Sequence, residues 1–192
     1  MAKHLQIEIG RLKKRILHIG AYVEESFQNA VVAVTRRDAE LAQRVLATHY
    51  EVDTMEVDLE EDCLKVLALY QPVARDLRFI VSILKVNNDL ERIGDLAENI
   101  AGRALSLAQH QRFEIPYDFV GMAESARNML HGALDALANL DAGVAYEVCA
   151  SDDRVDTINR DMYRKIKSAM LENPERIDAL LHLLSASRYV ER

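Results

Sequence analysis

The residues of this sequence whose types and spacing could do chemistry are polar side chains placed four residues apart. Glu91, Asp95 and Asn99 follow one another at this spacing, and His49 and Asp53 repeat it earlier in the chain. On a helix, residues four apart stand in a row on one side. Two such rows on neighbouring helices can bind one cation or a small metal cluster. The pattern therefore predicts a metal site formed by His49 and Asp53 with Glu91 and Asp95.

An internal repeat supplies a second set of such side chains. When residues 30–58 are aligned with 133–161, 11 of the 29 pairs are identical, and the Val-Asp-Thr triplets at 52–54 and 155–157 coincide. Asp152 and Asp156 then occupy the places of the histidine and the aspartate of the first row, and Glu191 begins a facing row. The chain is therefore two copies of a three-helix unit. The second copy stops where the partner of Glu191 would follow, so its last helix is expected to be cut short.

Long helices must carry these rows, because apolar residues recur at steps of three and four along the chain. The first run ends before Asp38, a good N-cap for the next helix, and the second run ends at Gln71-Pro72. Gly94 lies inside the third run, where a glycine suggests a close approach of two backbones. The third run is the most regular and predicts a buried seam at Phe79, Ile83, Val86, Leu90, Ile93, Ala97, Ile100 and Ala104.

These runs predict an all-α protein made of two tandem three-helix bundles. The first unit is expected at 1–110 and the second, incomplete unit at 119–192, with a linker at 111–118 that contains Pro116. Helical patterns cover roughly 119–139, 141–171 and 174–192, and no stretch has the pattern of a strand.

Composition excludes several classes of protein. A net charge of −7 argues against a general nucleic-acid binder, because phosphate contacts need a basic surface. No apolar run approaches the roughly 20 residues of a membrane span, and the first residues lack the apolar core of a signal peptide. Cys63 and Cys149 are expected to be reduced core thiols, although a disulfide between them stays open. We therefore expect a cytoplasmic protein without direct membrane insertion.

The simplest alternative is that the acidic rows are solvated helix flanks, which are common on long helices. The recurrence of the acids in both copies favours a site over a flank. Among the histidines, only His49 is a candidate ligand, whereas His18, His131 and His182 have the pattern of ordinary face or core residues.

The stretch VARDLRFIVSILKVNNDLERIGDLAENIA resembles the signature of the PhoU family, the phosphate-uptake regulators of bacteria and archaea. VDTMEVDLEEDC and the Gln-Pro junction also match, and the likeness covers almost the whole chain. The resemblance implies two three-helix bundles related by a pseudo-twofold axis, with metal clusters held by paired E/D-x-x-x-D motifs. It favours iron, which some members bind, while oxygen donors also suit magnesium and manganese and leave zinc open.

The family motif fits this sequence unevenly. Glu91 and Asp95 match it on the third helix, and Asp53 matches on the second, where His49 stands in place of the usual acid. Asp152 and Asp156 match on the second helix of the second copy. Glu191 begins the final motif, whose aspartate is not in this chain.

The resemblance implies a regulator that couples a phosphate ABC transporter, through its ATP-binding subunit, to a sensor histidine kinase, and that keeps the phosphate-starvation response off. A homodimer is also expected. The alternative is a ferritin-like carboxylate metal-binding protein or enzyme. The sequence contains no Glu-x-x-His pair, no GxSxG motif and no glycine-rich phosphate loop, so we do not expect an enzyme.

Overall fold

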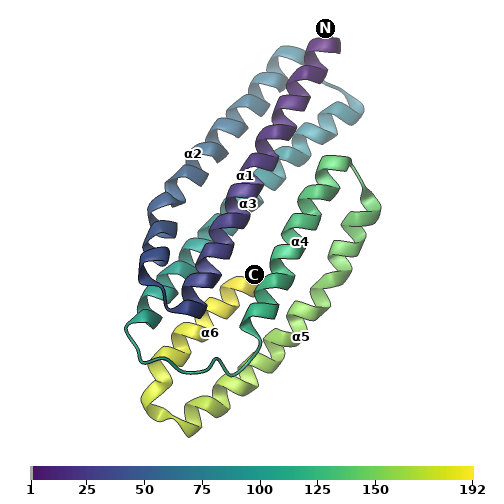
Figure 1. Cartoon of the computed structure of the whole chain (residues 1–192). Coiled ribbons are helices and arrows are strands. Elements are labelled where there is room, and N and C mark those ends of the chain that lie inside the picture. Colours follow the sequence, from purple (N-terminus) through teal and green to yellow (C-terminus); the bar gives the residue numbers. More distant parts are fainter. Residues whose placement is uncertain (1) are drawn as a thin grey trace.

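The computed structural model describes residues 2–192, which form six α-helices and a short 3₁₀ helix. In chain order these are α1 (Ala2–Arg36), α2 (Ala39–Tyr70), α3 (Ala74–Ala108), α4 (Phe119–Asn139), α5 (Ala142–Glu172), η1 (Pro174–Arg176) and α6 (Ile177–Glu191). α1, α2 and α3 run side by side, and α4, α5 and α6 form a second group beside the lower half of the first (Figure 1). No strand occurs in this part of the chain, so the all-helical prediction is confirmed.

The helix ends follow from local chemistry, and an aspartate N-cap begins the second helix of both copies. Asp38 caps α2 because its carboxylate accepts a hydrogen bond from the Leu41 N–H at 2.9 Å. Asp141, its counterpart in the repeat, caps α5 in the same way through the Gly143 N–H at 2.8 Å. α2 ends at Tyr70, where Gln71 adopts a left-handed conformation before Pro72. Each of these boundaries agrees with the prediction from the sequence.

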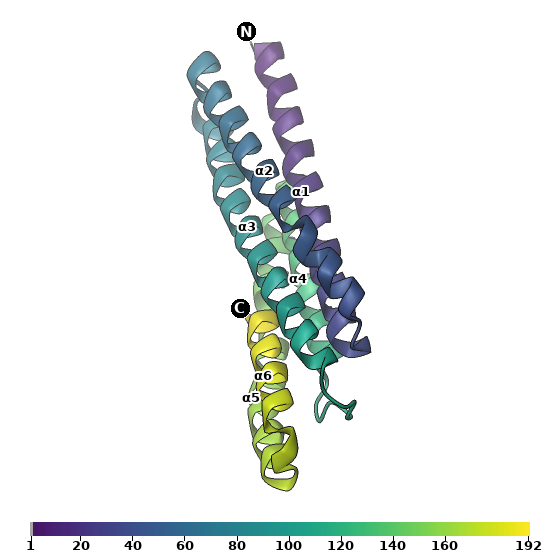
Figure 2. The ribbon, with the colours of Figure 1, turned by 90° about the vertical axis from the view of Figure 1, so that its left-hand side faces the viewer.

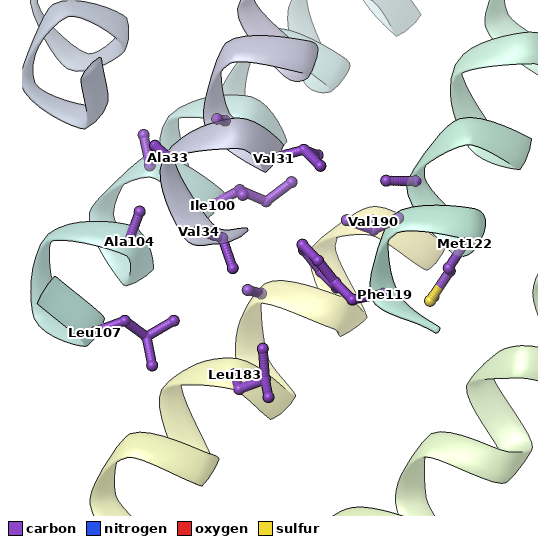
Figure 3. Close-up of a cluster of buried hydrophobic side chains, with 14 of the residues drawn as sticks. Val31, Ala33, Val34, Ile100, Ala104, Leu107, Phe119, Met122, Leu183 and Val190 are labelled. Carbon is purple, nitrogen blue, oxygen red and sulfur yellow. The ribbon is translucent and has the colours of Figure 1, made fainter. Parts of the chain in front are cut away.

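The two groups of helices share a hydrophobic core. One cluster of buried side chains joins the lower halves of α1 and α3 to α4, α5 and α6. Figure 3 shows Val34 of α1, Ile100 of α3, Phe119 of α4 and Leu183 of α6 gathered around a common space. Seen from the side, α6 lies along the lower part of α3 (Figure 2). The packing that buries these apolar faces therefore also fixes the second group of helices against the first.

The buried seam of α3 differs from its prediction at two of the eight positions. Val86 and Ile93 are only half-buried, whereas Asn87 and Gly94 face the interior. Asn87 Nδ2 donates a hydrogen bond to the Glu56 carbonyl of α2 at 2.9 Å, which accounts for a polar residue in this position. The apolar pattern missed Asn87 because it is polar, whereas the close approach expected at Gly94 is found against Val52.

The connection between α3 and α4 is tied to the helices on both sides. Arg37 Nη1 donates to the Leu107 carbonyl at 2.7 Å, and its guanidinium lies 4.7 Å from the centre of the Phe113 ring. Near the start of α4, the buried Tyr117 hydroxyl hydrogen-bonds to Ser187 of α6. These contacts tie the connection to the α1–α2 turn and to the second half of α6.

The cysteines differ from each other. Cys63 is buried in α2, and this burial raises the pKa of its thiol to about 11, as expected for an inert core residue. Cys149 is exposed on α5, so its prediction as a core thiol is wrong. Both thiols are free. Within residues 2–192, none of the helices is long and apolar enough to cross a membrane.

The close approach of α2 and α3 at Gly94 leads to the first prediction. A Cβ atom at this position would lie 3.2 Å from Val52 Cγ1, so Gly94→Leu forces the two helices apart. We expect this overpacking to lower the free energy of unfolding by about 1–3 kcal/mol in urea denaturation. Gly102→Leu, on the same helix, is the matched control, since a Cβ atom at residue 102 would have no neighbouring atom within 4 Å. Equal effects of the two substitutions would contradict the proposed close packing.

Candidate metal centre between α2 and α3

A histidine and three carboxylates converge where α2 and α3 face each other. His49 Nε2 lies 3.1 Å from Asp95 Oδ1, 3.4 Å from Glu98 Oε2 and 3.7 Å from Asp53 Oδ1. The imidazole is largely covered, with 17% of its side-chain surface exposed, whereas the three carboxylates are 41–53% exposed. The cluster therefore has a fixed nitrogen donor on its inner side and oxygen donors that solvent can reach.

The packing of α2 on α3 positions these side chains, because it fixes the residues that precede them in the sequence. Val52 is buried and packs on Gly94, and Asp53 and Asp95 come directly after these two residues. Because Gly94 has no side chain, only that of Val52 fills the space between the two backbones here, and the next residue of each helix is brought to the same edge of the interface. His49 precedes Asp53 by one turn and so lies on the same side of α2.

Negative charge accumulates around this edge. Burial raises the pKa of Glu91, and the neighbouring charges of Asp95 and Asp53 raise it further, against a smaller opposing effect of His49. Burial likewise raises the pKa of Glu56, helped by Glu60, Glu91 and Asp53. The carboxylates thus destabilise one another when all are ionised, and a bound cation would relieve this repulsion.

The structure brings the predicted first row together only in part. His49, Asp53 and Asp95 meet as expected, and Glu91 lies close enough for its charge to act on the group. Asn99 is exposed, and its side-chain amide donates to the Asp95 carbonyl at 2.8 Å. Glu98, which the sequence analysis did not select, takes part instead.

Glu98 could have been found by a helix period of 3.6 residues. A row at 91, 95 and 98 uses steps of four and three and stays on one side of α3, whereas 91, 95 and 99 drifts round the helix. The strict spacing of four was therefore the wrong template for a straight helix.

The second set of acids is more dispersed. Asp152 and Asp156 are exposed on α5, and Glu191 is half-exposed near the end of α6. Asp152 and Glu191 line one apolar groove of about 310 Å³, together with Phe27, Val155 and Tyr189. Among the described residues, these three acids do not belong to any group of three or more metal-binding side chains with donor atoms within 4.8 Å of one another. A twin metal site stays a prediction.

The donor set of the first site fits a metal ion. One imidazole nitrogen with carboxylate oxygens suits iron, manganese or zinc better than magnesium or calcium, which prefer oxygen alone. His49, Asp95 and Glu98 would hold the ion, with Asp53 and Glu91 within reach of its remaining positions. Because the carboxylates are half-exposed, such an ion would keep positions open to solvent.

Comparison with known proteins supplies the family. The PhoU domain model matches residues 16–104 and 119–192. A phosphate-specific transport system accessory protein PhoU homolog of Aquifex aeolicus is 34% identical over 185 residues, which cover 96% of this chain and 84% of that protein. These two matched ranges agree with the two copies found by the internal repeat, so the tandem arrangement is confirmed.

Solved structures have the same fold. The crystal structure of PhoU from Pseudomonas aeruginosa superposes with a TM-score of 0.90 at 35% identity, over 97% of this chain and 90% of that one. The phosphate transport system regulatory protein PhoU from Streptococcus pneumoniae gives a TM-score of 0.89 at 26% identity, over 97% and 88%. The predicted architecture is therefore that of known regulatory proteins.

Charge repulsion at the candidate centre predicts how stability depends on pH. The pKa of Glu91 is higher in the folded chain than its ordinary value of 4.5, so ionisation of this group at neutral pH costs folding stability. In metal-free protein at pH 7, Glu91→Gln should raise the free energy of unfolding, by less than about 1 kcal/mol because the site is half-exposed. The gain should disappear below pH 4.5, where the carboxyl group is protonated in both states. Glu147→Gln, at an exposed position of α5, should show neither effect.

Metal analysis tests the centre directly. We expect purified protein to contain iron or another transition metal, and Glu91→Ala/Asp95→Ala to lose it, as measured by elemental analysis beside chelator-treated samples. Asp152→Ala/Asp156→Ala removes two acids at equivalent spacing from α5 and tests the predicted twin site separately. Metal that survives the first pair of substitutions would contradict the assignment to α2 and α3, and loss with the second pair alone would move the site to the second copy.

Proposed function

The chain belongs to the PhoU family, and we propose that it regulates phosphate uptake and the phosphate-starvation response by binding other proteins. Its relatives are named as accessory or regulatory proteins of phosphate transport, so the prediction that it is not an enzyme is confirmed at the level of the family. The match of both repeats to the family model is the observation that carries the proposal. The proposed partners are the ATP-binding subunit of a phosphate ABC transporter and a sensor histidine kinase, both met in the cytoplasm by a homodimer.

An apolar surface at the turn between α2 and α3 supports a role in protein binding. Leu69 and Val73 are 75% and 74% exposed on either side of this turn, and Leu77 follows one helical turn later at 39%. Exposed apolar side chains that lie near one another are typical of interaction sites. We assign this end of the molecule, far along α2 and α3 from the second group of helices (Figure 1), to the ATP-binding subunit.

The metal centre would connect phosphate to this binding role. An ion held by His49, Asp95 and Glu98 would neutralise their charges and offer open positions to a phosphate oxygen. It would also fix α2 against α3 below the proposed binding end. Phosphate could thus bias the same two helices that carry the exposed apolar turn.

A ferritin-like metal store is the competing function, and the carboxylate cluster is the observation that favours it. Ferritin-like sites lie inside a bundle and use Glu-x-x-His pairs from two helices. Here the carboxylates are 41–53% exposed at the edge of two helices, and the sequence contains no such pair. These differences support the regulator.

A binding measurement tests the proposed function. We expect Leu69→Glu/Val73→Glu to lower the affinity for the purified ATP-binding subunit by at least tenfold in isothermal titration calorimetry, because charged side chains cannot be buried unpaired. Leu171→Glu is the matched control, since Leu171 is equally exposed at 75% but lies on α5. In cells that lack the native gene, Leu69→Glu/Val73→Glu should fail to repress phosphate-starvation genes, whereas Leu171→Glu should repress them normally.

Two outcomes would contradict this function. Full affinity of Leu69→Glu/Val73→Glu would exclude the α2–α3 turn as the docking surface. Normal repression of starvation genes in cells without the protein would exclude the regulatory role itself.

A further inference from the structure

A second group of metal-binding side chains lies at the opposite end of α3 from the α2–α3 turn. His110 follows the last turn of α3, and Asp178 and His182 lie one turn apart on the same side of α6. The sequence pattern alone indicates an ordinary histidine at position 182, whereas the structure places this residue beside a second histidine and a carboxylate.

We propose that His110, Asp178 and His182 bind a divalent transition metal ion, with zinc as the best fit, and that this ion joins the end of α3 to the start of α6. Two imidazoles and one carboxylate are a ligand set that zinc favours, with one position left for water. This site is separate from the cluster around His49, because it uses the end of α3 and the beginning of α6.

The geometry fits zinc coordination. His110 Nε2 lies 3.4 Å from Asp178 Oδ2, and one donor atom from each of the three side chains lies within 4.8 Å of the others. In a tetrahedral site with bonds of about 2.0–2.1 Å, neighbouring ligand atoms are about 3.3 Å apart. The first pair already has this spacing, and the ring centres of His110 and His182 are 6.1 Å apart with a tilt of 45°. The pairs that include His182 need side-chain rotations to reach the same spacing.

The backbone around the three ligands is fixed by packing. Ala179 and Leu183, which follow Asp178 and His182 in sequence, are buried in the shared core at 2% and 0% exposure. The His110 N–H donates to the Leu107 carbonyl at 3.2 Å, so the residue stays close to the end of α3. These contacts preorganise the site, which lowers the cost of ordering the ligands on binding.

The local charges are compatible with a bound cation. Asp178 supplies a negative charge, and its side chain is 75% exposed, which leaves a path for an ion from solvent. The positive charge of Arg103 also acts on His182 and opposes a cation, whereas the negative charge of Asp178 favours one.

A bound ion would link the two repeats. α3 belongs to the first matched range and α6 to the second, and His110 lies in the segment between them. The ion would thus add to the hydrogen bond of Tyr117 with Ser187 and to the shared core. Loss of the ion should loosen the start of α6 without unfolding the first three helices.

The experiment is a zinc titration of full-length protein labelled with nitrogen-15 in its histidines, followed by two-dimensional NMR of the imidazoles. The signals of His110 and His182, assigned from His110→Gln and His182→Gln, should change together at stoichiometric Zn²⁺ and not with Mg²⁺. His131 is the internal control, because its two ring nitrogens face Glu24 and Asp135 separately, at 3.2 and 3.7 Å. Its signals should stay in place.

The variants add a second measurement. Asp178→Asn/His182→Gln should weaken zinc binding at this site by more than tenfold, because removal of a direct ligand exceeds the 10–100-fold cost of losing an outer hydrogen bond. Zn²⁺ should also slow amide hydrogen exchange at the start of α6 in wild type, and not in this variant. Unchanged His110 and His182 signals in wild type, or changes only at concentrations that also move His131, would overturn the proposal whether or not a variant folds.

Discussion

The contact between Val52 of α2 and Gly94 of α3 is the constraint on which the candidate centre depends. A Cβ atom at residue 94 would already be 3.2 Å from Val52 Cγ1, so the helices approach more closely than a residue with a side chain would readily allow. Asp53 and Asp95 follow these residues directly. The 3.1 Å distance from His49 to Asp95 is a consequence of this approach, whereas His49 and Asp53 face each other one turn apart on α2. Glycine in a helix interior costs about 1 kcal/mol in helix propensity, and here the close packing offsets this cost.

The second repeat keeps the same framework with different chemistry. Val155 and Asp156 repeat Val52 and Asp53, and Val155 is buried as its counterpart is. On the other side, however, Val155 borders an apolar groove rather than a helix that carries a glycine. The duplicated acids of α5 therefore have no facing row within the described residues, and they remain exposed. The duplication kept the acids at equivalent positions of α5, but a metal site also requires donor side chains on a neighbouring helix.

Much of the fold could be predicted from the sequence, because helix ends and apolar faces depend on nearby residues. Asp38, Gln71 and Asp141 mark helix boundaries through local hydrogen bonds and backbone conformation. Gly94 was expected at a close approach of two helices, and it lies there, against Val52. The interior position of Asn87 could not be predicted in this way, since it depends on which partner helix lies opposite. The same reason explains the group at His110, whose members meet through packing of distant segments. Glu98 was missed for a different reason, because a strict spacing of four was applied to a helix with a period of 3.6 residues.

Packing also decides between a metal centre and a solvated acidic flank. On a free helix surface, like charges move apart into water, and little energy is lost. Here the core holds α2 and α3 in contact, so Glu56 and Glu91 are partly buried beside further carboxylates, and their pKa values rise for that reason. The fold keeps these charges together and places His49 Nε2 3.1–3.7 Å from the carboxylates of Asp53, Asp95 and Glu98. A cation bound at that point would relieve the repulsion between the carboxylates. This balance favours the metal centre as the origin of the acidic rows.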